Sequence, residues 1–108
     1  MARPLIPEAE HKAWIAQVTE QALEPELDIC DAHHHLWLDE GHTGWPYPLE
    51  DFLAHTGSGH KVSHSVYLEC GAQYRLDGPH HLRPAGETTW VAGEASRSAA
   101  SGGTEIRG

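Results

Sequence analysis

Residues 28–37 read Asp-Ile-Cys-Asp-Ala-His-His-His-Leu-Trp, and this stretch decides which fold the chain is expected to adopt. The short apolar run Leu27–Cys30 leads directly into three histidines and predicts a strand. Side chains on a strand alternate between its two faces, so we expect His33 and His35 to point to one side and His34 to the other. The sequence therefore predicts a strand whose carboxyl end projects two imidazoles together.

The spacing of His33 and His35 suits a single metal ion. Cα atoms two residues apart on a strand lie roughly 6.5 to 7 Å from each other. Two ring nitrogens at that spacing can meet on one ion at about 2.0 to 2.1 Å. Asp31 has the same parity and either orients an imidazole or simply ends the strand. A solvated histidine-rich loop stays open as an alternative, because short metal motifs give many false positives.

Helices and strands are expected to alternate on either side of this motif. Apolar residues recur at helical spacing over Pro7–Leu23, and Pro25 should end that helix. Residues 38–48 are polar and rich in glycine and proline, which predicts a loop. A short helix is expected at Leu49–Thr56 and a second strand at Ser63–Cys70.

The remaining sequence predicts a loop over residues 71–86, a helix over 87–100 and a terminal loop over 101–108, without a third strand. Strands joined through a helical crossover are typical of a parallel sheet. A closed eight-stranded barrel takes about 250 residues. We therefore expect an α/β fold consisting of the first two strand-helix units of a (β/α)8 TIM barrel. In this incomplete barrel, residues 1–26 form an N-terminal helical extension and residues 27–108 form the partial barrel.

Charge and composition argue against several classes of function. The formal net charge is −9, with only seven Lys and Arg residues, which disfavours nucleic acid and anionic membrane surfaces as partners. Apolar runs stay well short of the roughly 20 residues of a membrane helix, and the amino terminus has no apolar leader. We expect a cytoplasmic protein in which Cys30 and Cys70 are reduced and buried, with a disulfide between neighbouring strands as the alternative.

Two runs resemble a known family. The run DICDAHHHLW resembles the first-strand motif of the amidohydrolase superfamily, in particular the branch of TIM-barrel metal-dependent hydrolases that includes sugar lactonases. The run SVYLECGAQYRLDGPHHLRPAGETTWVAGEAS resembles the second strand, loop and helix of that branch. The resemblance covers most of the chain from about Asp28 onward. It implies that His33 and His35 are metal ligands, most often for zinc.

The same resemblance implies the chemistry. The family hydrolyses a lactone, ester or amide bond of a small-molecule substrate: the metal activates water and polarises a carbonyl, and an aspartate on the eighth strand is the general base. Some relatives decarboxylate acids instead. Further ligands come from the fifth and sixth strands, which this sequence lacks. Because a catalytic zinc normally has three protein ligands, we expect this chain to be nearly inactive alone.

Several weaker candidates follow the second strand. Glu69 at its end, and Tyr74 and Arg75 in the next loop, are candidates for substrate binding, since an arginine can pair with a substrate carboxylate. An exposed loop surface explains them equally simply. No role is predicted for a further set of histidines that lack ligand spacing: His42, His55, His60 and His64.

Two alternatives to a hydrolase remain open. In the first, the chain is a non-catalytic, histidine-rich protein that binds a divalent metal through His33 and His35 together with His80 and His81. In the second, it is an interaction fragment whose exposed strand edge completes a sheet on a partner. Two strands with unpaired edges would also allow a homo-oligomer.

Overall fold

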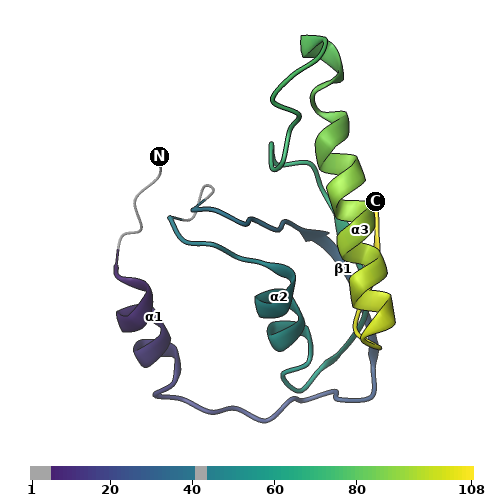
Figure 1. Ribbon diagram of the computed structural model, residues 1–108. Coiled ribbons are helices and arrows are strands. Elements are labelled where there is room, and N and C mark those ends of the chain that lie inside the picture. The colour runs from purple at the N-terminus through teal and green to yellow at the C-terminus, as the bar shows by residue number, and fades with distance from the viewer. Residues whose placement is uncertain (1–5, 41–43) are drawn as a thin grey trace.

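The computed structural model describes residues 6–40 and 44–108, which form a mixed α/β arrangement around a small, open parallel sheet (Figure 1). Parts of the predicted extension and of the 38–48 loop, and His42 with them, lie outside these residues. The elements in chain order are α1 (Glu8–Ile15), β1 (Asp28–His34), α2 (Leu49–Thr56), β2 (Lys61–Tyr67), a 3-10 turn η1 (His80–Leu82), α3 (Ala85–Ala100) and β3 (Glu105–Arg107).

The sheet has the order β1-β2-β3, and both pairs of strands are parallel. β1 pairs with β2, and α2 lies between them in the chain, which confirms the predicted strand-helix-strand unit. Asp28 pairs with Lys61 at the start of the two strands, and His34 pairs with Tyr67 at their ends. The register shifts between Asp31 and His34, so the histidine motif lies at an irregular point of the edge strand.

The expectation of only two strands, with a loop at the carboxyl end, is wrong. Residues Glu105–Arg107 form β3, which pairs with β2 through Ser65 and Ile106. Side-chain hydroxyls attach this segment to the sheet: Ser98 donates to the carbonyl of Thr104, and Thr104 donates to the carbonyl of Val62 at 2.7 Å. These contacts join residues that are far apart in the sequence, and three residues are too few to show a strand pattern.

A hydrophobic core lies between the sheet and helices α2 and α3. It consists of Leu36, Leu49, Phe52, Tyr67, Val91 and Ile106. Leu36 lies just after β1 and the other members come from α2, α3, β2 and β3, so both helices cover the same face of the sheet (Figure 1). On the opposite face, the paired strand residues Cys30 and His64 are exposed. The described residues therefore form a two-layer arrangement with one sheet face uncovered.

The boundaries of α1 and β2 differ from those predicted, and α3 begins at Ala85, two residues earlier than predicted. The helix expected over Pro7–Leu23 ends at Ile15 in the structure and buries no residue. Trp14 is 67% exposed. Short helices without a packing partner are marginal in water, so periodicity alone does not extend α1 to Pro25. Within the described part of the chain, no helix is long and apolar enough to cross a membrane.

β2 begins earlier than predicted and also ends earlier, at Tyr67 rather than Cys70. The backbone amides of Cys70 and Gly71 donate to the carboxylate of Glu87 at 2.9 and 3.1 Å, so they are not available to continue the sheet. Both cysteines are free thiols, and Cys30 is exposed rather than buried. The predicted burial of Cys30 is therefore wrong, and that of Cys70 holds only in part.

Candidate metal site and the loop behind it

His33 and His35 point toward each other, as strand alternation predicts. Their Nε2 atoms are 3.0 Å apart, and their rings meet edge to face with centroids 4.8 Å apart. Two nitrogens bound to one tetrahedral zinc at about 2.0 to 2.1 Å would lie roughly 3.3 Å from each other. The observed separation is within a few tenths of an ångström of that value, so the pair fits two positions of one ion.

A backbone carbonyl fixes the orientation of the second imidazole. The Nδ1 atom of His35 is 2.8 Å from the carbonyl oxygen of Leu68, which directly follows β2. A carbonyl oxygen can only accept a hydrogen bond, so Nδ1 must carry the proton. The Nε2 atom of His35 then carries the lone pair and accepts a hydrogen bond from the Nε2–H of His33 at 3.0 Å, and a metal ion would take the place of that proton. Metal-binding histidines ordinarily donate their other ring N–H in this way.

The ligand set is incomplete in the described part of the chain. No group of three or more His, Cys, Asp or Glu side chains there is placed to hold one ion. Asp31 accepts a hydrogen bond from the backbone amide of His33 at 3.1 Å, so its contact is with the main chain rather than with an imidazole. The donor types fit zinc, but a catalytic ion needs at least one more protein ligand.

His34 packs into the core on the other side of the strand. It is 7% exposed, and its ring stacks on Phe52 at 4.2 Å between centroids and meets Tyr67 edge to face at 5.5 Å. Burial lowers the pKa of His34, which favours the neutral ring. The buried His34 ring fixes the rotation of β1 about its axis, and this rotation directs His33 and His35 to a common side.

A hollow of about 410 Å³ lies against the histidine motif and brings in two residues that the sequence did not indicate. The hydroxyl of Tyr47 is 2.6 Å from Nδ1 of His55, and both residues line the hollow together with His33 and His35. Tyr47 reaches this position because its backbone pairs with Trp37, just after the motif. Eight residues separate Tyr47 from His55, a spacing that matches no metal or catalytic motif.

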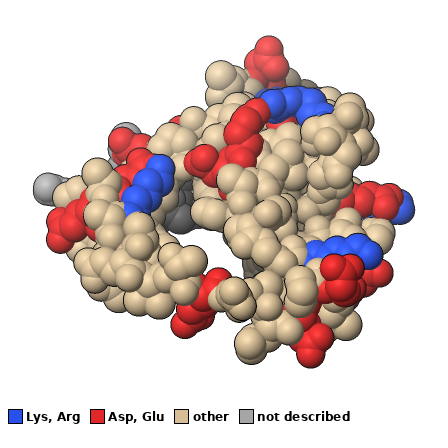
Figure 2. All heavy atoms as spheres, turned by 90° about the horizontal axis from the view of Figure 1, so that it is seen from below, with Lys and Arg blue, Asp and Glu red and all other residues tan. Residues whose placement is uncertain are grey.

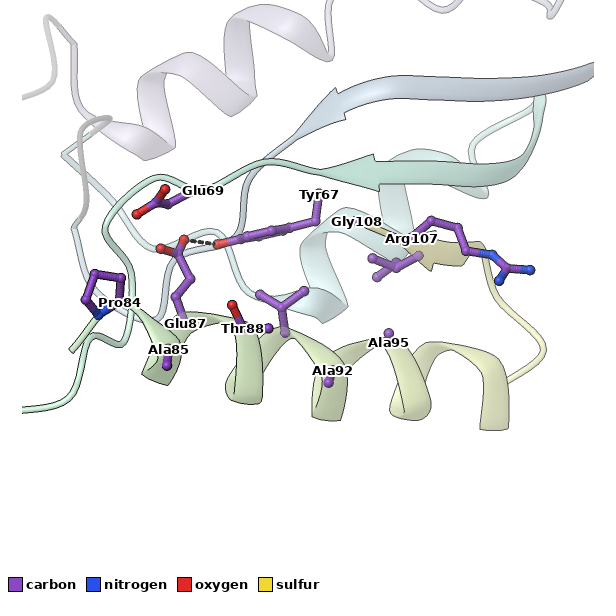
Figure 3. A pocket seen from close by; sticks show the side chains of 12 residues that line it. Tyr67, Glu69, Pro84, Ala85, Glu87, Thr88, Ala92, Ala95, Arg107 and Gly108 are labelled. Atoms are coloured by element: carbon purple, nitrogen blue, oxygen red, sulfur yellow. Dashed lines mark hydrogen bonds between the residues drawn. The ribbon is translucent and has the colours of Figure 1, made fainter. Parts of the chain in front are cut away.

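The candidate substrate-binding residues lie elsewhere. Glu69 lines a second hollow, of about 760 Å³, between α3 and the β2–β3 side of the sheet (Figure 3). The hydroxyl of Tyr74 donates to Glu69, which raises the pKa of Tyr74 to about 12. The backbone amide of Arg75 donates to the carbonyl of Arg83 at 2.9 Å. The structure joins Glu69 with Tyr74, but it places Glu69 in a different hollow from the two histidines.

Glu87, on α3, was not identified from the sequence, and it contacts the end of β2 and the segment that follows it. Only 3% of its surface is exposed, and its carboxylate accepts hydrogen bonds from the Tyr67 hydroxyl at 2.7 Å and from the amides of Cys70 and Gly71 (Figure 3). Burial alone would raise the pKa of Glu87, but these hydrogen bonds outweigh it, so the pKa lies below the usual 4.5. Burial and the hydrogen bonds to Cys70 and Glu87 raise the pKa of Tyr67, which therefore stays a neutral donor.

Comparisons with known proteins add no relative: no family model, no curated protein and no solved structure matches this chain. The resemblance to the amidohydrolases therefore rests on the two sequence runs alone.

Surface charge is the remaining feature of the structure that is relevant to binding partners. Figure 2 shows one face on which Lys and Arg lie beside acidic groups, in agreement with four sets of ion pairs: Lys12 with Glu8, Lys61 with Asp28, Arg97 with Glu50 and Glu94, and Arg107 with Glu105.

Proposed function

We propose that this chain supplies the first two metal ligands, His33 and His35, of an amidohydrolase-type metal-dependent hydrolase built on a TIM barrel. The observation that carries the proposal is the convergence of the two Nε2 atoms at 3.0 Å, with the Nδ1 proton of His35 held by the carbonyl of Leu68. The parallel sheet, with both helices on one face, is also the local arrangement from which such a barrel is built.

In this proposal the chain's own residues bind and orient. The Nε2 atoms of His33 and His35 converge on one side of β1, and the carbonyl of Leu68 holds the His35 ring in the tautomer that leaves its Nε2 free to coordinate once a metal ion replaces the Nε2–H of His33. A bound divalent ion, most simply zinc, supplies Lewis-acid activation of water and of a lactone, ester or amide carbonyl. Since the described residues provide neither a third ligand nor an assigned base, we expect metal binding without appreciable turnover.

The test is metal binding by the untagged chain and two matched variants. The change His33→Ala/His35→Ala removes the proposed ligands, and His80→Ala/His81→Ala removes an exposed pair of histidines from η1. Zinc affinity is measured by competition with a chromophoric chelator. We expect zinc binding in the wild type and in the η1 variant, and its loss in the β1 variant.

The other outcomes contradict the proposal in different ways. Equal loss in both variants would favour a histidine-rich surface that holds metal collectively. Absence of zinc binding in all three proteins would remove the metal step from the proposal. Hydrolysis of lactones and esters by the wild type, if it survived the β1 change, would show that any activity is independent of this pair.

A further inference from the structure

Glu87 holds the segment that follows β2 from the helix side. Its Oε1 atom accepts from the Tyr67 hydroxyl and the Cys70 amide, and its Oε2 atom accepts from the Gly71 amide. In Figure 3 the carboxylate reaches up from the first turn of α3 toward Tyr67. With the Cys70 thiol, which lies 3.4 Å from Oε1, four donors on two acceptor atoms hold both the side chain at the end of the strand and the backbone just beyond it.

The same short segment carries the acceptor that orients the metal-site histidine. Leu68 lies between Tyr67 and Cys70, and its carbonyl accepts from Nδ1 of His35 at 2.8 Å. Its amide donates to the carbonyl of His34 at 3.1 Å. Leu68 is thus hydrogen-bonded to His34 and His35, while its neighbours Tyr67 and Cys70 are hydrogen-bonded to Glu87. Displacement of those neighbours would move the carbonyl that holds the His35 proton.

A second contact runs through the ring of Tyr67. That ring meets the ring of His34 edge to face at 5.5 Å and the ring of His35 at 6.4 Å between centroids. Its hydroxyl is the group that Glu87 binds. Glu87 is therefore connected to the site both through the backbone of residues 68–71 and through the packing of Tyr67.

We propose that Glu87 is a positioning residue for the metal site: it holds Leu68 and Tyr67 so that His35 keeps its Nδ1–H tautomer and presents Nε2 to His33. The inference rests on the proposed metal-binding function, but the tautomer of His35 can be measured with or without metal. Glu87 itself touches neither imidazole, and its effect is exerted entirely through the residues that it holds.

Glu87→Gln is the informative change because the two side chains have the same shape. A carboxamide has one acceptor oxygen and one NH2 group. At least one donor held by Glu87 must then face the NH2 group, which displaces either the amide of Gly71 or the donors from Tyr67 and Cys70. Removing direct outer-shell partners of metal ligands typically costs 10- to 100-fold in affinity. Because Glu87 lies one contact further away, we expect zinc binding to weaken by about tenfold.

The chain offers a matched control on the same helix. Glu94 lies two turns after Glu87 on α3, is 9% exposed and pairs with Arg97 rather than with the loop. Glu94→Gln removes a comparable buried charge without touching residues 67–71. Urea unfolding of both variants provides the free energy of unfolding for each, so that a general loss of stability can be recognised.

The experiment combines two readouts on wild type, Glu87→Gln and Glu94→Gln. ¹⁵N chemical shifts of the neutral His35 ring report its tautomer, and chelator competition reports zinc affinity. We expect a dominant Nδ1–H form in the wild type and in Glu94→Gln, and a mixture of tautomers with about tenfold weaker zinc binding in Glu87→Gln.

The failures of the two proposals are distinguishable. An unchanged His35 tautomer in Glu87→Gln would overturn the positioning role, whatever happens to zinc. Equal loss of zinc affinity in the two Gln variants, in proportion to their loss of stability, would overturn it as well. If no protein binds zinc but the tautomer shifts only in Glu87→Gln, the metal function fails and the positioning of His35 by Glu87 stands.

Discussion

Replacing Tyr67 by Phe tests the hydrogen bond between Tyr67 and Glu87, which joins the end of β2 to α3. The ring stays in place, so its packing against His34 and Trp90 is retained. Only the hydroxyl is lost, and with it the 2.7 Å hydrogen bond to Glu87 and the 3.4 Å contact with the Cys70 thiol. Tyr67 and Glu87 are 7% and 3% exposed, so water replaces the lost donor poorly. Hydrogen bonds to charged groups contribute about 1.5–3 kcal/mol, and we expect a loss of about 2 kcal/mol.

Urea unfolding followed by tryptophan fluorescence measures this loss. For a chain of this size, a loss of about 2 kcal/mol lowers the urea midpoint by roughly 1–2 M. Tyr74→Phe is the matched control: its hydroxyl donates to the exposed Glu69, and we expect a change below about 0.5 kcal/mol. If the two variants shift the midpoint equally, the buried hydroxyl does not stabilise the fold through Glu87 and the reasoning is refuted.

Three further predictions concern α3. Gly86→Ala should destabilise the chain by about 1–3 kcal/mol, because a Cβ would lie 2.6 Å from the Gln73 carbonyl oxygen and 2.7 Å from the Arg75 nitrogen. Gly93→Ala on the open side of α3 should stabilise by about 0.5–1 kcal/mol, and a destabilising result in urea would contradict the helix assignment. The lowered pKa of Glu87 means that its contribution to stability is present above pH 4.5 and is lost as the pH falls through the folded-state pKa. The stability difference between wild type and Glu87→Gln should therefore shrink below about pH 4.5, and a constant difference down to pH 3 would exclude this linkage.

Sequence reasoning predicted the elements whose signals are local. The helix at Leu49–Thr56 has the predicted bounds, because a short amphipathic stretch between proline and glycine defines both of its ends. The parallel pairing of β1 and β2 followed from the helix between them. By contrast, β3 is held by hydroxyl contacts from Ser98 and Thr104 and by the burial of Ile106, none of which three residues of sequence can show.

In the candidate site, too, the features that depend on local backbone geometry were predicted and those that depend on long-range contacts were not. Strand alternation placed His33 and His35 together and His34 apart, because that geometry depends only on the local backbone. Glu87 could not be recognised, since an acidic residue in the first turn of a helix is ordinarily a solvated partner of the helix dipole. Its burial is decided by the amides of residues 70 and 71, which lie 16 to 17 positions earlier in the chain.

The residues that hold the fold together and those that orient the proposed metal ligands are largely the same. His34 packs between Phe52 and Tyr67, and this packing sets the direction of its two neighbours on β1. Tyr67 belongs to the core and also binds the carboxylate that fixes the loop after β2. Stability and site geometry therefore cannot be changed independently in this region. A loss of zinc binding identifies a metal ligand only when the free energy of unfolding of the variant is unchanged. Because His33 is exposed, its replacement meets this condition better than the replacement of a buried residue such as His34 or Tyr67.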